Sequence, residues 1–233
     1  MKKLLLLLVF CTSCFAEPIE FVVGAVPGGS NDSVSRKLME QIESKSDLKF
    51  VMVYKPGAGQ KIGYSYVLQS NKPTVIVSTS EIMDVELKDN VDTIFNLGEF
   101  NNLVLVNAQS NIYTITDLAK KSQINFGHGG EGTFSYRAMQ QVCKNMNCLP
   151  VPFKGGSEAM ISILSNTIDA FAVSNYGAQY VTNDKFRAIG YVHVKNSWLK
   201  LFGRNLTKSD KKTIQNVLKN TDTKFYTDMG LHV

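Results

Sequence analysis

Short apolar runs alternate with amphipathic stretches along most of the chain. In the first part, "IEFVVG", "KFVMVYK" and "PTVIVST" have the length of buried strands, and helix-like segments lie near 32–44 and at "IGYSYVLQ". In the second part, the strand-like runs "NNLVLVN", "SQINFG", "LPVPFK" and "IDAFAVS" are separated by "ITDLAKK", "FSYRAMQQVCKNM" and "EAMISILS". The run "FRAIGYV" and the amphipathic helix "SDKKTIQNVLKNT" follow. This alternation predicts an α/β architecture with mostly parallel sheets.

Four of the predicted strands lead into glycine-rich segments. These are "PGGSND" (27–32), "KPGAGQKIG" (55–63), "GHGGEGT" (127–133) and "KGGSEA" (154–159). In open α/β sheets, ligands bind beyond the carboxyl ends of the strands, where helix N-termini offer unpaired N–H groups. Because glycine also lets the backbone approach a ligand closely, the four segments together predict a cleft lined by peptide N–H groups.

The first sixteen residues, "MKKLLLLLVFCTSCFA", have the layout of a secretory signal peptide. Two lysines precede an apolar stretch from Leu4 to Phe10, and small residues follow as far as Ala16. Processing as a lipoprotein at Cys14 is the alternative, although Cys11 fits poorly upstream of it. No later run approaches the roughly 18 apolar residues that a membrane-spanning helix needs. We therefore expect an exported, periplasmic protein after removal of residues 1–16.

The charge balance does not point to a nucleic-acid partner. The chain has 25 Lys and Arg against 20 Asp and Glu, and removal of Lys2 and Lys3 leaves 23 against 20, a net charge near +3. The lysines are spread out and the arginines form no cluster, whereas nucleic-acid binding needs a concentrated basic patch. We expect neither a nucleic-acid partner nor a cofactor.

Two cysteines, Cys143 and Cys148, remain in the segment "VCKNMNC" after the leader. In an oxidising compartment we expect a local disulfide between them, with two unpaired thiols near a helix end as the alternative. No cluster of histidine or acidic residues accompanies them, so a metal site is not expected.

Three motifs raise the question of an enzyme. "GGSEA" around Ser157 is close to the nucleophile elbow G-x-S-x-G, but Ala159 takes the last position and Ser157 is also a natural helix N-cap. His128 lies inside a glycine-rich loop, and nothing assigns any of the three histidines as a base. "GHGGEG" fits the dinucleotide pattern G-x-G-x-x-G, but no acidic residue follows near 147–153. An exported hydrolase that uses Ser157 or His128 stays open as the alternative to a binding protein.

Taken together and in this order, the loops resemble the periplasmic solute-binding receptors of the tripartite tricarboxylate transporter family, the Bug receptors. "VPGGSNDSVSR" resembles their first loop and helix, "VMVYKPGAGQKIG" their P-G-A-G-x-x-I-G segment, and "INFGHGGEGT" their second-lobe loop. "VPFKGG", "NTIDAFAVSN" and "KFRAIGYV" are similar to later segments. The chain departs from the family where His128 replaces a usual serine, where Gln60 replaces a glycine, and in several shortened segments. It is identified as a short member.

The resemblance implies a periplasmic-binding-protein fold whose two α/β lobes close on a small carboxylate for delivery to the permease subunits of the transporter. It implies a monomer in which residues 17–100 and 187–233 form lobe 1 and residues 101–186 form lobe 2. A receptor-like sensing domain without transport is a further alternative. Carried over by position, the ligand-binding residues are Gly28, Gly29, Ser30, Asn31, Asp32, His128, Gly129, Gly130, Gly132, Thr133, Lys154, Gly155, Ser174 and Asn175.

Overall fold

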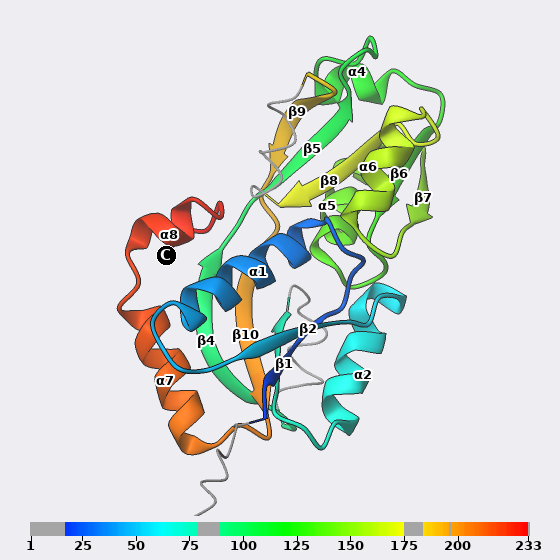
Figure 1. Cartoon of the computed structure of the whole chain (residues 1–233). Coiled ribbons are helices and arrows are strands. Elements are labelled where there is room, and N and C mark those ends of the chain that lie inside the picture. The colour runs from blue at the N-terminus through cyan, green and yellow to red at the C-terminus, as the bar shows by residue number, and fades with distance from the viewer. Residues whose placement is uncertain (1–16, 79–88, 175–183, 196, 233) are drawn as a thin grey trace, which may run out of the picture.

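The computed structural model describes residues 17–78, 89–174, 184–195 and 197–232. It contains two five-stranded sheets with helices packed against them, and these form two lobes (Figure 1). The predicted α/β class and two-lobed architecture are therefore confirmed. The expected signal peptide lies outside the described residues.

The sheet of the first lobe has the strand order β2-β1-β3-β10-β4. Its strands are β1 (Ile19–Val23), β2 (Phe50–Tyr54), β3 (Thr74–Ser78), β4 (Asp92–Glu99) and β10 (Trp198–Arg204). The helices of this part of the chain are α1 (Ser30–Glu43), η1 (Ala58–Gln60), α2 (Lys61–Gln69), α7 (Lys208–Lys219) and α8 (Thr223–Thr227). Every residue of β1 and β3 is buried, because these apolar strands lie inside the sheet.

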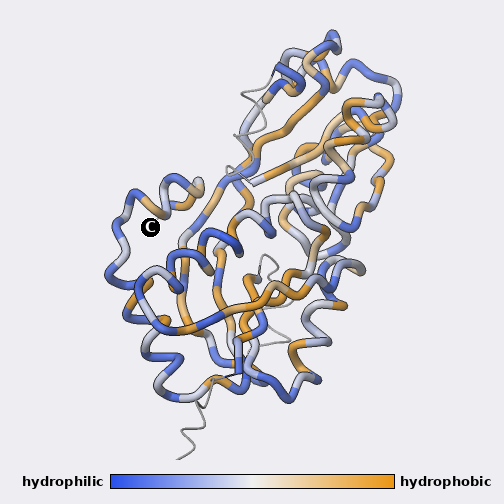
Figure 2. The backbone as a smooth tube through the Cα atoms, in the orientation of Figure 1, coloured by the Kyte–Doolittle hydropathy of each residue, from blue (hydrophilic) through white to orange (hydrophobic). Residues whose placement is uncertain are grey.

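The sheet of the second lobe has the order β7-β6-β8-β5-β9. Its strands are β5 (Asn102–Asn107), β6 (Ile124–His128), β7 (Cys148–Pro152), β8 (Ala170–Ser174) and β9 (Phe186–Val192). The helices of this lobe are α4 (Ile115–Ala119), α5 (Phe134–Val142), η2 (Cys143–Asn145) and α6 (Gly156–Leu164). Apolar residues concentrate along the strands of both lobes, as Figure 2 shows, so each sheet contributes to the core.

Both sheets are mixed, which corrects the expectation of mostly parallel sheets. β1 runs parallel to β2 and β3, and β6 runs parallel to β7 and β8. In contrast, β10 is antiparallel to β3 and β4, and β5 is antiparallel to β8 and β9. The strands β5 and β10 each enter a lobe directly from a strand of the other lobe. They are reached without the helical crossover that brings a chain back parallel to its neighbour.

The predicted boundary between the lobes at residue 187 differs from the observed strand pairing. β9 was expected to return to the first lobe, but it pairs with β5 in the second sheet, and β10 is the strand that returns. Arg187 explains this placement, because its guanidinium donates to the carbonyl oxygens of Ala108, Ser110 and Ile112 in the second lobe. The change of sheet therefore comes after Val192.

The expected disulfide between Cys143 and Cys148 is present, with 5.9 Å between the two Cα atoms. It joins η2 to the start of β7, and so fixes the short connection between them.

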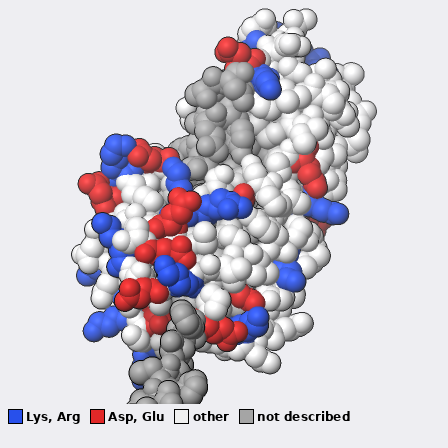
Figure 3. Space-filling view, viewed as in Figure 1, with Lys and Arg blue, Asp and Glu red and all other residues white. Residues whose placement is uncertain are grey.

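On the face seen in Figure 3, charged side chains of both signs are interspersed over the first lobe, whereas the second lobe is mostly uncharged there. Among the described residues, no helix has the length and apolar character to cross a bilayer.

Candidate ligand-binding site

A cavity of about 110 Å³ lies between the two lobes, where the glycine-rich loops of both meet. Its polar side is built from the loop before α1, the loop after β6 and the loop before α6. Residues of eight predicted positions line it: Gly29, Ser30, Asn31, Gly129, Thr133, Lys154, Gly155 and Ser174. The structure thus brings together segments that are more than a hundred residues apart in the sequence.

Other predicted ligand contacts do not line the cavity. Gly28, Asp32, His128, Gly130 and Gly132 are absent from its wall. Asn175 lies outside the described residues. Two of these side chains, Asp32 and His128, have partners within the loops that carry the wall.

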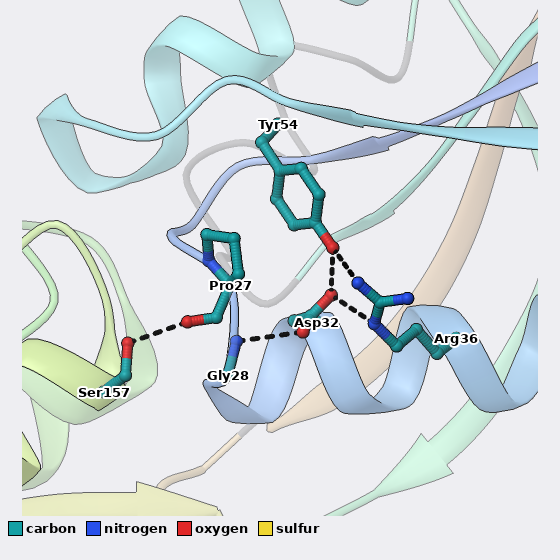
Figure 4. A network of polar contacts seen from close by, with 6 residues as sticks. All are labelled: Pro27, Gly28, Asp32, Arg36, Tyr54 and Ser157. Carbon is teal, nitrogen blue, oxygen red and sulfur yellow. Dashed lines mark hydrogen bonds and ion pairs between the residues drawn. The ribbon is translucent and has the colours of Figure 1, made fainter.

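Asp32 organises the first-lobe loop. Its carboxylate accepts hydrogen bonds from the Gly28 N–H at 2.9 Å, from Arg36 Nε at 3.0 Å and from the Tyr54 hydroxyl at 2.5 Å (Figure 4). Burial of the carboxyl raises its pKa, but these three hydrogen bonds outweigh burial, and the pKa of Asp32 lies below its ordinary value. Asp32 is therefore an ionised support that fixes the loop entering α1.

His128 supports the second-lobe loop in the way that Asp32 supports the first-lobe loop. Its side chain is buried, its Nδ1 accepts the Gly130 N–H at 3.1 Å, and its ring meets that of Tyr136 edge to face. Burial lowers the pKa of His128, although the negative charge of Glu131 acts in the opposite direction. Since Nδ1 must be unprotonated to accept this bond, the neutral imidazole stabilises the loop.

Some backbone N–H groups of the second-lobe loop donate hydrogen bonds to side chains of the same segment. Gly129 N–H donates to the Ser135 hydroxyl at 2.9 Å, and Thr133 Oγ1 accepts from Tyr136 N–H at 3.4 Å as the N-cap of α5. Thr133 Oγ1 also donates to the Gly130 carbonyl at 2.7 Å. The expected donation of the Gly129 and Gly130 N–H groups to a ligand is therefore replaced by bonds within the loop.

Two of the helices that begin at the cavity have glycine as their N-cap residue and no side-chain cap. The N-cap residues of α1 and α6 are Gly29 and Gly155, and neither helix start has a side-chain cap hydrogen bond in the described chain. By contrast, α4 and α7, which begin away from the cavity, have complete capping boxes from Thr114 and Thr207. The first N–H groups of a helix lack partners inside the helix. An anion between the lobes could accept from both sets.

The lobes contact each other through glycines. A β-carbon on Gly59 would lie 2.6 Å from the Glu131 carbonyl oxygen, and one on Gly130 would lie 2.6 Å from the Gly59 Cα. Gly59 and Gly130 have φ of +62° and +105°, a region that side chains disfavour. A β-carbon on Gly29 would likewise lie 3.4 Å from the Gly156 nitrogen. The glycine-rich loops therefore allow the two backbones to meet, in addition to any contact with a ligand.

The Ser157 hydroxyl adds a polar contact between the lobes. It donates to the Pro27 carbonyl oxygen at 2.9 Å, as Figure 4 shows. Since this hydrogen bond goes to a backbone carbonyl, and the imidazole of His128 is engaged with Gly130, neither residue has the partner that an activated nucleophile needs. The hydrolase alternative is not favoured.

Several wall residues were not predicted from the sequence. Asn102, Phe100, Met229 and Leu231 line the cavity beside the expected loops, as does Gln60, which stands where the family has glycine. Gln60 Oε1 accepts from Asn31 Nδ2 at 3.0 Å, so this departure supports the first-lobe loop.

In the described parts of the chain, no three His, Cys, Asp or Glu side chains gather into a group that could hold a metal ion.

The chain is similar in sequence to UPF0065 proteins and in fold to periplasmic binding proteins. It is 26% identical over 191 residues to a UPF0065 protein from the gbd 5' region of Cupriavidus necator, a match that covers 74% of this chain and 58% of that protein. Among solved structures, the periplasmic binding protein BugD has a TM-score of 0.79 at 19% identity, covering 93% of this chain and 88% of BugD. MatC from Rhodopseudomonas palustris, with bound malate, has a TM-score of 0.76 at 17% identity, covering 91% and 88%.

The resemblance to the Bug receptors is confirmed. The match to the curated relative spans less than two thirds of that protein's length, and the structural likeness carries the periplasmic-binding-protein fold over nearly the whole described chain. No family model matches the chain.

Proposed function

We propose that this protein is an exported, periplasmic solute-binding receptor. It closes its two lobes on a small organic anion, a carboxylate, and delivers it to the permease subunits of a tripartite tricarboxylate-type transporter. The observation that carries the proposal is the pair of uncapped helices, α1 and α6, which begin at one cavity from opposite lobes. The bound malate of the MatC structure supports a carboxylate as the ligand.

The physical basis of capture is hydrogen bonding by backbone N–H groups. Each hydrogen bond to a charged group contributes about 1.5 to 3 kcal/mol, and the positive ends of two helix dipoles favour an anion between them. An anion that caps α1 and α6 at once can do so only when the lobes are together. Ligand binding therefore stabilises the closed form, as in hinge closure around other ligands.

Thermal unfolding of the chain without its leader tests the proposal. A ligand at one hundred times its Kd adds about 2.7 kcal/mol to the free energy of unfolding, which raises Tm by about 5 to 11 °C for a chain of this size. We expect such a rise with at least one member of a panel of small carboxylates, without turnover of that compound. Absence of any shift across the panel would contradict the proposal. Hydrolysis of a generic ester, lost in Ser157→Ala, would favour the hydrolase.

The use of N–H groups is tested separately with two variants. Gly29→Val places a branched side chain beside the Gly156 nitrogen, whereas Lys154→Met removes an exposed cation from the cavity edge and keeps the length of the side chain. By isothermal titration with the best carboxylate of the panel, we expect Gly29→Val to raise Kd at least tenfold and Lys154→Met to raise it less than threefold. The reverse order would mean that a salt bridge provides the grip.

A further inference from the structure

We infer that the ligand is a monocarboxylate with a compact apolar body, an inference that rests on the proposed function. The cavity is lined by two unlike sets of residues. One set is formed by the polar glycine-rich loops. The other set is apolar and is here called the apolar wall: Val34, Phe100, Phe134, Leu199, Met229 and Leu231. All six are buried and belong to one hydrophobic cluster that runs through both lobes.

The apolar wall is rigidly assembled. The rings of Phe100 and Phe134 meet edge to face with 4.6 Å between their centroids. Met229 and Leu231 are held in place by their neighbour His232, whose backbone exchanges two hydrogen bonds with Glu99, at 2.9 and 2.7 Å. The exposed fractions of Met229 and Leu231 are 1% and 2%, so both are packed within the hydrophobic cluster.

The described part of the apolar wall offers a second carboxylate no cationic partner. Among the described lining residues, Lys154 is the one with a charged side chain, and it is exposed and adjacent to Gly155 in the polar loops. A ligand carboxylate held by the helix N-termini would leave a second carboxylate against aliphatic and aromatic side chains. Burial of an unpaired charge is strongly unfavourable, because nothing in the apolar wall replaces the lost water.

The volume of the cavity limits the body of the ligand. An engineered apolar cavity of about 150 Å³ holds benzene, and the cavity described above, at about 110 Å³, is of the same order. A body of about four or five carbon atoms therefore fills it. Such a body gains from contact with the apolar wall in proportion to the apolar area that it buries.

The inference is tested by titration of the chain without its leader with hexanoate and with adipate, which share six carbon atoms and differ by the second carboxylate. Benzoate and malate complete the panel. We expect hexanoate or benzoate to bind at least tenfold more tightly than adipate and malate. Equal affinity, or tighter binding of adipate or malate, would overturn the monocarboxylate and leave the receptor function standing. Binding of none of the four, with no shift across the wider carboxylate panel, would overturn both.

A wall substitution tests where the ligand body lies. Met229→Ala removes side-chain volume from the apolar wall, so octanoate should gain at least fivefold in affinity relative to hexanoate. Met160→Ala is the matched control, because Met160 is also buried, lies in a separate hydrophobic cluster and does not line the cavity. The control should keep the ratio of the two affinities. An unchanged ratio in Met229→Ala, or the same change in both variants, would place the ligand body elsewhere.

Discussion

At the scale of single residues, the structure separates side chains that face the ligand cavity from those that fix its loops. Asp32 and His128 lie in two of the glycine-rich segments, and both were predicted as ligand contacts. Both instead bond to backbone N–H groups of their own loops, at Gly28 and Gly130. A chemically distinctive residue in a binding loop can thus serve the geometry of the loop rather than the ligand.

The side-chain amide of Asn102 has a hydrogen-bond donor without a partner among the described residues. Its side chain is 1% exposed, and its Nδ2 has no partner among the described residues. A buried donor without a partner costs about 1 to 3 kcal/mol. We therefore expect Asn102→Leu to raise the free energy of unfolding of the ligand-free protein by about 1 kcal/mol in urea denaturation.

The matched control for that variant lies in the same strand. Asn107 Nδ2 donates to the Asn166 side chain at 3.1 Å and its Oδ1 accepts from Gln109 N–H at 2.9 Å. Asn107→Leu should lower the free energy of unfolding by about 1 to 3 kcal/mol, because it leaves those partners unpaired. If both variants destabilise equally, Nδ2 of Asn102 is not the source of a penalty.

His128 predicts a dependence of stability on pH. Burial lowers its pKa in the folded chain below the ordinary value of 6.5, so the unfolded chain binds a proton more readily. The stabilisation is complete above about pH 6.5 and is lost as the pH falls through the lowered pKa. Between about pH 7 and pH 5, the free energy of unfolding should fall less in His128→Ser than in the native chain. An equal fall in His128→Ser and in the native chain would contradict this prediction.

At the scale of elements, the alternation of apolar and amphipathic segments predicted most strands and the glycine-rich loops between them. It could not assign β9 to a lobe, because that depends on partners such as Ala108 and Ile112 that Arg187 meets only in the folded chain. It also missed the apolar wall. Phe100, Met229 and Leu231 look like ordinary core residues in the sequence, and their place at the cavity results from the packing of distant segments.

The meeting of η1 with the second-lobe loop makes a prediction at this scale. A methyl group at Gly59 would collide with the Glu131 carbonyl, so Gly59→Ala should hold the lobes apart and raise the ligand Kd at least tenfold. Small-angle scattering in the presence of the ligand should then give a larger radius of gyration than for the native protein.

Backbone strain alone could produce part of that effect, and Gly98→Ala controls for it. Gly98 has a φ of +125°, and it lies in β4, away from the contact between Gly59 and Glu131. Gly98→Ala should lower stability yet leave closure unchanged. A Gly59→Ala protein that closes normally would show that the contact between Gly59 and Glu131 does not limit closure.

At the scale of the whole molecule, the two lobes are joined by peptide connections and by side-chain contacts between them. The hydrogen bond from Ser157 to the Pro27 carbonyl is one of these contacts. A net contribution of about 0.5 to 1.5 kcal/mol corresponds to a two- to twelvefold change in affinity if the open form lacks it. Ser157→Ala should weaken ligand binding by that factor in isothermal titration.

Ser162→Ala provides the comparison, because the Ser162 hydroxyl donates to the Glu158 carbonyl oxygen within α6, inside a single lobe. It should leave Kd unchanged. Equal affinities of the native protein and Ser157→Ala would mean that this hydrogen bond persists in the open form or adds nothing to closure.

The position of β10 in the first sheet has a consequence for how the chain is assembled. In the described sheet, β4 is an edge strand that pairs with β10. Glu99 pairs with Trp198, and the second lobe lies between these two residues in the sequence. When the polypeptide emerges from its amino-terminal end, β4 has no partner until the second lobe has been made. The second sheet, whose strands run without interruption from β5 to β9, can complete itself first. Folding of the first lobe is then the late and aggregation-prone step, with an open strand edge as its hazard.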